Sequence, residues 1–361
     1  MITPWGELEI LQLNDADTQK TVLFYEKAQL LEGLVVEQVL DQILSSTAAV
    51  EGIRPVPVEL VIAKSRGTSK GSAFVWIHQQ TAEVVPLLDC LCQRYATWPI
   101  IFDASKREFL TSATPHERGR PIAFTIKLQD QMRLYTGRAP AFTAISASVR
   151  DASRQEQAFW GFLVGAYGDR LTECVLLPRI LKNFGIQAFF DWVWDVDRLF
   201  LTVGSGTFWA MEIKHKFPIP SDCSFGLNTG EFRLLQDLSG IGIRCLHVVA
   251  VKPYWDKDRS SQYLFNDMAA REHVLLLACE IDRNIAEAMQ RGGSATSGGH
   301  TTFTGSGTLT FYRLPADRFH KVGLLASTVE RNAAGFASML LGQSAPFTSP
   351  AEIRGHRMGN R

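Results

Sequence analysis

The stretch DRLFLTVGSGTFWAMEIK (Asp197–Lys214) consists of two apolar runs joined by a glycine-containing segment. This pattern predicts a β-hairpin, because glycine adopts the backbone conformations that tight turns need. If Gly204 and Ser205 form the loop, counting outward along both strands brings Asp197 opposite Glu212. The hairpin therefore predicts two carboxylates on neighbouring strands, close enough to interact.

Side chains alternate between the two faces of a strand, so Lys214 shares a face with Glu212. The opposite face carries apolar side chains that we expect to enter a core, namely Trp209, Met211 and Ile213. A longer loop, from Gly204 to Gly206, would set Asp197 diagonal to Glu212 and Lys214. In either register two carboxylates and one ammonium converge.

Two neighbouring carboxylates repel each other unless a positive charge lies between them. Mg²⁺ is bound in proteins through one or two carboxylates together with waters and substrate phosphates. Such an ion lowers the pKa of a bound water and polarises a phosphodiester, and Lys214 could position or deprotonate that water. The hairpin favours metal-dependent phosphodiester hydrolysis, and a solvated ion pair between Glu212 and Lys214 is the alternative interpretation.

The flanking segments predict further elements. Helical spacing over Gly168–Gly185 is followed by an aromatic, β-branched run, Ile186–Trp194, which favours a strand. After the hairpin, Asn228 and Glu231 have the spacing of a capping box at the start of a helix. The run Ile243–Val251 then predicts a buried strand. The expected order is helix, three antiparallel strands, helix, strand.

This order, together with Asp197 and the sequence Glu212-Ile213-Lys214, resembles the PD-(D/E)XK nuclease superfamily over residues 165–252. The resemblance implies a restriction-endonuclease-like αβββαβ core. It also implies that Asp197 and Glu212 hold Mg²⁺, or Mn²⁺ in its place. Ile213 would lend its main-chain carbonyl to the ion, and Lys214 would serve the attacking water.

The resemblance extends to two further positions. Glu173 stands where many members carry an acid on the first helix, which binds or orients a second ion. Val196 precedes the aspartate, where the family signature has proline. Many members act as dimers, so the resemblance also implies a homodimer or a partner protein.

The chain has 361 residues, enough for two domains, and its composition is 46% hydrophobic, which can bury a substantial core. We expect a mixed α/β protein in which residues 1–150 form an α/β domain for recognition of substrate or partner. Residues 151–361 would form the nuclease-like domain with a C-terminal helical extension. The polar stretch 151–157 is the candidate boundary.

The N-terminal half contains a basic turn between two apolar runs, which carries Lys64, Arg66 and Lys70. Because the formal net charge is zero, binding of nucleic acid would depend on such local patches. We expect these three side chains to contact phosphates, and a solvated hairpin tip is the alternative. Nearby, Lys20–Leu30 is compatible with a strand, and Leu34–Leu44 has helical spacing.

Toward the C-terminus, the segment Tyr263–Gln290 favours a helix. The start of the chain lacks a signal-peptide pattern and no apolar run is long enough to span a membrane, so we expect a cytoplasmic protein. The six cysteines include no C-x-x-C pair, which argues against zinc and a disulfide framework.

The sequence thus predicts a magnesium-dependent nuclease that hydrolyses phosphodiester bonds in DNA. Two alternatives stay open. One is an RNA-directed nuclease with the same fold and chemistry. The other is a non-catalytic subunit that binds nucleic acid or acts as a scaffold in a larger complex.

Overall fold

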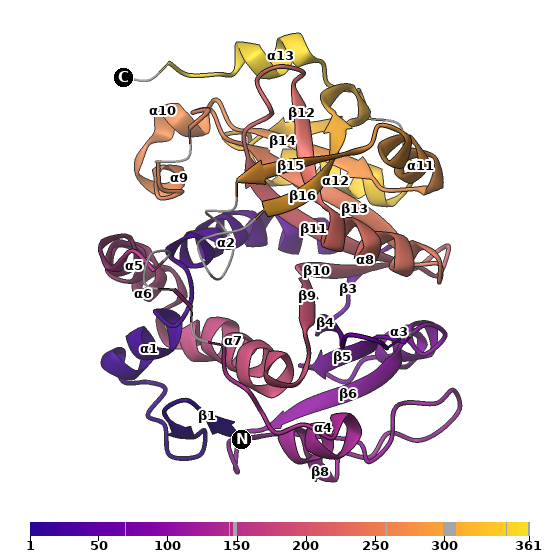
Figure 1. Ribbon diagram of the computed structural model, residues 1–361. Coiled ribbons are helices and arrows are strands. Elements are labelled where there is room, and N and C mark those ends of the chain that lie inside the picture. The colour runs from indigo at the N-terminus through magenta and orange to yellow at the C-terminus, as the bar shows by residue number, and fades with distance from the viewer. Residues whose placement is uncertain are drawn as a thin grey trace.

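A computed structural model of the chain describes residues 1–68, 70–143, 145–146, 150–256, 259–298, 308–343 and 345–359 (Figure 1). Within these residues the fold is mixed α/β, as expected, and contains two six-stranded sheets. The first sheet lies in the upper half of Figure 1 and the second in the lower half. The candidate hairpin belongs to the first sheet.

The first sheet has the strand order β17-β14-β13-β11-β10-β3. Its strands are β3 (Ile53–Pro55), β10 (Arg198–Thr202), β11 (Thr207–Lys216), β13 (Arg244–Val251), β14 (Leu275–Glu280) and β17 (His320–Leu324). Strand β11 is antiparallel to β10 and parallel to β13. The chain between β11 and β13 passes through β12 (Ser224–Asn228) and helix α8 (Thr229–Ser239).

The second sheet has the order β8-β7-β6-β5-β4-β9. Its strands are β4 (Val58–Lys64), β5 (Ser72–Ile77), β6 (Ala96–Asp103), β7 (Glu108–Thr111), β8 (Ile126–Lys127) and β9 (Trp192–Val196). The two sheets do not separate at the polar stretch 151–157. Strand β3 precedes that stretch but lies in the first sheet, and β9 follows it but lies in the second.

The β10–β11 register is the predicted one. Thr202 pairs with Thr207 and Arg198 with Met211, so the next residue outward, Asp197, lies across from Glu212. The residues Val203–Gly206 form the turn, and Gly206 has a φ of 64°, a left-handed conformation that glycine adopts without strain. The alternation of side chains is also as expected, although both faces of β11 are buried.

Helices cover the two faces of the first sheet. On one face, α2 (Ala28–Ala48) shares a hydrophobic cluster with Trp209, Met211 and Ile213. On the other face, α8 shares a second cluster with Phe208 and Ala210. Because β11 lies between two layers of helix, charged side chains near its C-terminal end are drawn out of bulk water.

The expectation of a strand at Ile186–Trp194 paired beside the hairpin is wrong. Strand β9 begins at Trp192 and pairs with β4 in the second sheet. Only Asp197 separates β9 from β10, which is too short a connection for the two strands to fold back on each other. The position beside β10 in the first sheet is taken by β3, which pairs antiparallel to it.

The chain from 152 to 189 is helical but interrupted. It comprises α5 (Ala152–Ala158), η2 (Phe159–Leu163), α6 (Val164–Tyr167), η3 (Gly168–Arg170), η4 (Thr172–Leu176), α7 (Leu177–Ile180), η5 (Leu181–Ile186) and η6 (Gln187–Phe189). The expected helix at Gly168–Gly185 is present as a series of π, α and 3₁₀ turns. Pro178, which has no N–H to donate, lies in the first turn of α7, directly after the π turn η4.

Two other local predictions are wrong. The segment Lys20–Leu30 is not a strand, because it spans the end of α1 (Ala16–Leu23) and the start of α2; Asp15 caps α1 by accepting a hydrogen bond from Thr18 N. The segment Tyr263–Gln290 is not one helix, because its apolar centre forms β14, a strand buried between β13 and β17. The helix at Leu34–Leu44 is confirmed within α2.

The remaining elements are short or peripheral. They are β1 (Ile2–Thr3), β2 (Gly6–Glu7), α3 (Val84–Leu91), α4 (Leu128–Thr136), α9 (Tyr263–Asn266), α10 (Met268–Arg271), α11 (Arg283–Arg291), β15 (Ser294–Gly298), β16 (Thr308–Pro315), η7 (Ala316–Arg318), α12 (Val329–Leu340) and α13 (Pro350–Gly355). Strands β12, β16 and β15 form a small antiparallel sheet.

Candidate active site

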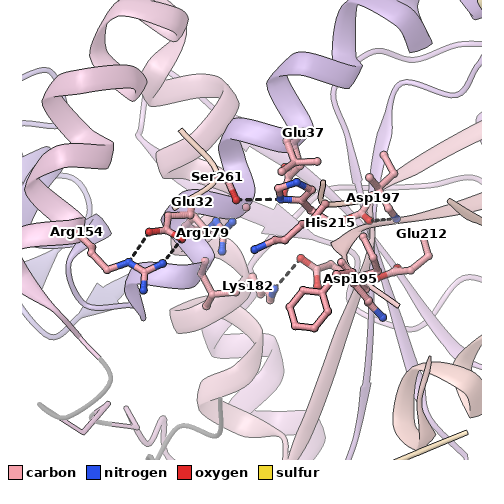
Figure 2. A pocket seen from close by; sticks show the side chains of 18 residues that line it. Glu32, Glu37, Arg154, Arg179, Lys182, Asp195, Asp197, Glu212, His215 and Ser261 are labelled. Atoms are coloured by element: carbon pink, nitrogen blue, oxygen red, sulfur yellow. Dashed lines mark hydrogen bonds and ion pairs between the residues drawn. The ribbon is translucent and has the colours of Figure 1, made fainter. Parts of the chain in front are cut away.

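A charged cavity of about 560 Å³ opens where the C-terminal end of β11 meets α2 and the interrupted helical region (Figure 2). Its charged lining residues are Glu32, Glu37, Arg154, Arg179, Lys182, Asp195, Asp197, Glu212, Lys214, Lys216 and Lys252. Acidic and basic side chains from both halves of the chain therefore line one space.

The hairpin supplies the centre of this cavity. Asp197 is half-buried, and its Oδ2 accepts a hydrogen bond from the main-chain N of Ile213 at 2.6 Å. Glu212 is only 5% exposed, and its Oε1 forms an ion pair with Lys214 Nζ. The three side chains that the sequence predicts to converge are thus brought together near the C-terminal end of β11, an interior strand of the first sheet.

Helix α8, which covers the face of the first sheet opposite α2, adds a third carboxylate. Its Asn228 cap accepts a hydrogen bond from Gly230 N at 2.8 Å, but Glu231 does not close the capping box. Instead, Glu231 Oε1 lies 3.9 Å from Lys214 Nζ and 3.8 Å from Nδ1 of the fully buried His247. The ammonium of Lys214 therefore lies between the buried Glu212 and the largely buried Glu231.

Helix α2 contributes Glu37, which the sequence did not single out. Glu37 is half-buried and points toward the hairpin in Figure 2. Burial and the negative charge of Asp197 raise the pKa of Glu37 to about 7. Glu37 therefore carries a weakly held proton near neutral pH and responds to any change of charge at Asp197.

The surroundings of the hairpin raise the pKa values of its two acids and of its lysine. Burial raises the pKa of Asp197 although the Lys214 ammonium lies nearby. Burial and the neighbouring Asp197 raise the pKa of Glu212 well above its ordinary value. Burial works to lower the pKa of Lys214, but Glu212, Glu231 and Asp197 together raise it well above its usual range. The charged forms of Asp197 and Glu212 are thus disfavoured, whereas the charged form of Lys214 is favoured.

Asp195 behaves differently from its neighbour. Its Oδ2 lies 2.6 Å from Lys182 Nζ, and this ion pair is drawn in Figure 2. Although the partial burial of this half-exposed side chain opposes its charge, Lys182 and the guanidinium of Arg179 hold the pKa of Asp195 below its ordinary value. The pKa of Asp195 is thus lowered, whereas the pKa values of Asp197 and Glu212 are raised.

A second cavity of about 170 Å³ adjoins the first, since both are lined by Glu37, Arg179, Lys182, Asp195 and Asp197. Its other wall comes from β4 of the second sheet. The candidate site therefore lies where the two sheets meet.

The far wall of the main cavity carries Arg154, His215 and Lys252. Arg154 forms a two-pronged ion pair with Glu32, with both N–O distances 2.7 Å. His215 contacts Ser261 Oγ at 3.1 Å and Tyr263 OH at 2.6 Å. Burial and the nearby Lys252 lower the pKa of His215 well below its usual value, so its ring is neutral at physiological pH. Arg154 is thus neutralised by Glu32, and Lys252 supplies the other positive charge of this wall.

The donor set at the hairpin fits a hard divalent cation. Mg²⁺ accepts carboxylate and carbonyl oxygens and keeps several waters, so it does not require a cage of protein ligands. Asp197 and Glu212 offer carboxylates whose charge is poorly compensated, and Ile213 offers a main-chain carbonyl between them. Among the described residues, no group of three or more His, Cys, Asp or Glu side chains is arranged to hold a metal ion. The set therefore suits an ion completed by water or substrate.

Glu173 does not join these residues. It is exposed on the π-helical turn η4, and it lines neither of the two cavities. The helix acids near the hairpin are instead Glu37 of α2 and Glu231 of α8. The sequence offered one signal for Glu37, which is that it is a charged residue within the apolar run LVVEQVL. No pattern in the neighbouring residues connects that run to the hairpin, which lies about 160 residues further along the chain.

The basic turn lies away from the main cavity. Lys64, Arg66 and Lys70 flank the β4–β5 turn and line a separate cavity of about 290 Å³ together with Arg138.

Lys182 and Asp195 were also outside the predicted site, because their pairing depends on how the interrupted helical region packs against β9.

A scan against protein-family models and searches of curated proteins and of solved structures find no match to this chain. In the part of the chain that the structure describes, no helix has the length and apolar character needed to cross a membrane.

Proposed function

We propose that this protein is a divalent-metal-dependent nuclease that hydrolyses phosphodiester bonds in DNA. The observation that carries the proposal is the position of Asp197 across from Glu212, with Lys214 on the same strand face, inside a charged cavity. In the alternative of a solvated ion pair at a strand end, both side chains would be exposed to water. Glu212, however, is only 5% exposed.

The order of elements supports the same proposal. Along the first sheet the chain runs α2, β3, β10, β11, α8 and β13, which is the αβββαβ order of the restriction-endonuclease-like core. Residues between β3 and β10 form the second sheet and the interrupted helical region. In this assignment the helix is α2, the first strand is β3, and Glu37 replaces Glu173 as the helix acid.

Asp197, Glu212 and the carbonyl of Ile213 would hold the ion, which would acidify a bound water and polarise the phosphodiester. Lys214 is a hydrogen-bond donor because its pKa is raised, so its ammonium orients the attacking water or stabilises charge on the phosphate. Glu37 accepts or releases a proton near neutral pH. Lys252 on the far wall attracts the phosphate backbone.

A cleavage assay tests the proposal. The purified protein is incubated with supercoiled plasmid, linear duplex and single-stranded DNA, and RNA, each with Mg²⁺, Mn²⁺ or EDTA. We expect DNA cleavage that requires the divalent ion. Full activity in EDTA would contradict the metal-dependent mechanism, and cleavage of RNA alone would replace the DNA substrate by RNA.

The alternative of a non-catalytic subunit predicts binding without cleavage under every condition. It leaves unexplained why three acids with raised pKa values, Glu37, Asp197 and Glu212, face one cavity. Retaining buried, poorly compensated charge is costly for a scaffold that could carry neutral side chains there.

A further inference from the structure

The cavity beside the basic turn has an aromatic floor and a cationic rim. It measures about 290 Å³ and lies between the β4–β5 turn and the C-terminal end of α4. Tyr135 and Phe190 are the aromatic part of its lining, which we call the floor, and Lys64, Arg66 and Arg138 belong to the cationic part, which we call the rim. An apolar ring surface surrounded by positive charge matches the two parts of a nucleotide, its base and its phosphate.

The aromatic floor is held in place. Tyr135 is 43% exposed, and its ring meets Trp98 edge-on with 5.0 Å between the ring centroids. Its hydroxyl lies 3.5 Å from Ser72 Oγ on β5. A supported ring with one open surface loses little conformational freedom when a base stacks on it.

A single carboxylate fixes the rim. Asp191 Oδ2 accepts a hydrogen bond from Arg66 N at 2.8 Å and lies 3.4 Å from Arg138 Nη1. Asp191 thereby ties the basic turn to the loop after α4. Next to it, Trp192 is 42% exposed and lies beneath the Arg66 guanidinium, with 5.9 Å from Cζ to the ring centroid. The two basic segments form one surface.

Strand β9 connects this surface to the candidate active site. Trp192, at its start, pairs with Lys64, whereas Asp195 pairs with Val61 at the wall of the second cavity. The five steps along the extended chain from Trp192 to Asp197 span roughly 16 Å at about 3.3 Å a residue. This distance corresponds to a few nucleotides of a strand.

We propose that the cavity between the β4–β5 turn and α4 binds an unpaired nucleotide of the DNA strand whose phosphodiester is cut at Asp197. Bases in a duplex are stacked on one another, so their faces are covered and cannot stack on the Tyr135 ring, whereas an unpaired base can. The substrate class is therefore DNA with a single-stranded segment beside the cut. The position of the cut rests on the proposed function; the binding of the unpaired nucleotide does not.

Binding measurements test this inference separately from cleavage. The Asp197→Asn protein in EDTA is titrated with a fluorescent deoxythymidine oligonucleotide and with a blunt duplex hairpin of the same length. Each is repeated in combination with Tyr135→Ala or Tyr135→Phe. We expect Tyr135→Ala to weaken single-strand binding by roughly 5- to 150-fold and to leave duplex binding unchanged. Tyr135→Phe keeps the ring and should bind like its parent.

The rim is tested by charge. Neutralising Lys64, Arg66 and Arg138 to glutamine should flatten the salt dependence of single-strand binding by about 0.7 in slope for each lost contact. Arg283→Gln and Arg291→Gln on α11, far from this surface, serve as the control and should not change it. Thermal melts establish that each variant is folded.

Two outcomes would overturn the inference. One is unchanged single-strand affinity in folded Tyr135→Ala protein. The other is an equal loss of single-strand and duplex affinity, because a duplex should not reach the ring. A protein that binds as expected but never cleaves would leave this inference standing and remove the proposed nuclease function.

Discussion

Ile213 donates its main-chain N–H to Asp197 Oδ2 over 2.6 Å. The last paired residues of the β10–β11 ladder are Arg198 and Met211, so the carboxylate continues the ladder one step further by taking the place of a main-chain acceptor. The backbone of β11 thus holds Asp197 opposite Glu212. The hydrogen bond also means that the acid can be altered without removing the contact that positions it.

Asp197→Asn should remove metal-dependent cleavage and preserve the fold. The asparagine carbonyl oxygen still accepts the Ile213 N–H, but the negative charge is lost. We expect Mg²⁺ affinity to fall by at least about 10- to 100-fold, which is the effect of losing a group that merely supports a metal ligand. Isothermal titration with Mg²⁺ and a plasmid cleavage assay measure the two effects.

Asp195→Asn is the matched control on the adjacent strand. Asp195 pairs with Lys182 instead of facing Glu212, so its loss should leave a measurable fraction of cleavage. The opposite ranking of the two variants, with both proteins folded, would show that Asp195 is the metal ligand and that Asp197 only secures the β11 backbone.

Lys214→Ala should separate metal binding from catalysis. The carboxylates of Asp197 and Glu212 remain and lose a competing cation, so Mg²⁺ affinity should be retained or increased. Cleavage should fall by about 10²- to 10⁴-fold, the usual contribution of a positioned proton donor or acceptor. Lys106→Ala, at a side chain that is 70% exposed, is the control and should match the wild type. Loss of Mg²⁺ binding in Lys214→Ala would make the lysine a structural support for the acids.

The raised pKa of Glu37 makes the stability of the metal-free protein dependent on pH. Its carboxyl has a pKa of about 7 in the folded chain against an ordinary value of 4.5, so between these pH values the folded state binds more protons than the unfolded state. The free energy of unfolding should therefore fall as pH rises from about 4.5 to about 7 and then level off. The shift corresponds to at most about 3 kcal/mol, and solvent screening of this half-buried group reduces the expected effect to roughly 1 kcal/mol.

Urea unfolding in EDTA at pH 5 and pH 8 measures this slope, with Glu37→Gln as the comparison. The variant should keep only the part of the slope that comes from Asp197 and Glu212, whose pKa values are raised in the same direction. At pH 8, Mg²⁺ should stabilise the wild type more than the variant. Equal slopes in the two proteins would mean that Glu37 ionises freely.

The hairpin was predictable because its information is local. The turn at Val203–Gly206 and the alternation of side chains fix which residues of β10 and β11 face each other, and so fix Asp197 opposite Glu212. The same rules of alternation placed Lys214 beside Glu212. Where a site is built from one tight turn and two strands, the sequence contains nearly all of its geometry.

The remaining parts of the site depend on contacts between distant segments. The run before Asp197 has strand propensity, but pairing with β4 instead of β10 follows from the missing turn and from the second sheet. Glu37 lies on α2, and its approach to Asp197 depends on how that helix packs across the first sheet. Propensity and periodicity describe single elements, so neither β9 nor Glu37 could be assigned to its partner.

Gly230→Ala should reduce cleavage by moving β9. A Cβ at Gly230, in the first turn of α8, would lie 2.9 Å from Trp194 Cζ2. Without this contact alanine would favour the helix by about 1 kcal/mol, so a destabilised variant would itself indicate the clash. We expect a loss of about 1 to 3 kcal/mol in stability and a lower cleavage rate, because Trp194 directly precedes Asp195 and any shift of the strand displaces Asp197.

Trp194→Phe supplies the rescue, since the smaller ring lacks both the Cζ2 and the Nε1 atoms that the new methyl group would meet. The double variant should recover part of the stability and of the cleavage rate lost in Gly230→Ala, with a coupling energy of about 0.5 to 3 kcal/mol. Urea unfolding and single-turnover cleavage on the four proteins of the cycle measure it. Additive effects of the two substitutions would mean that the α8–β9 contact does not position the acids of the hairpin.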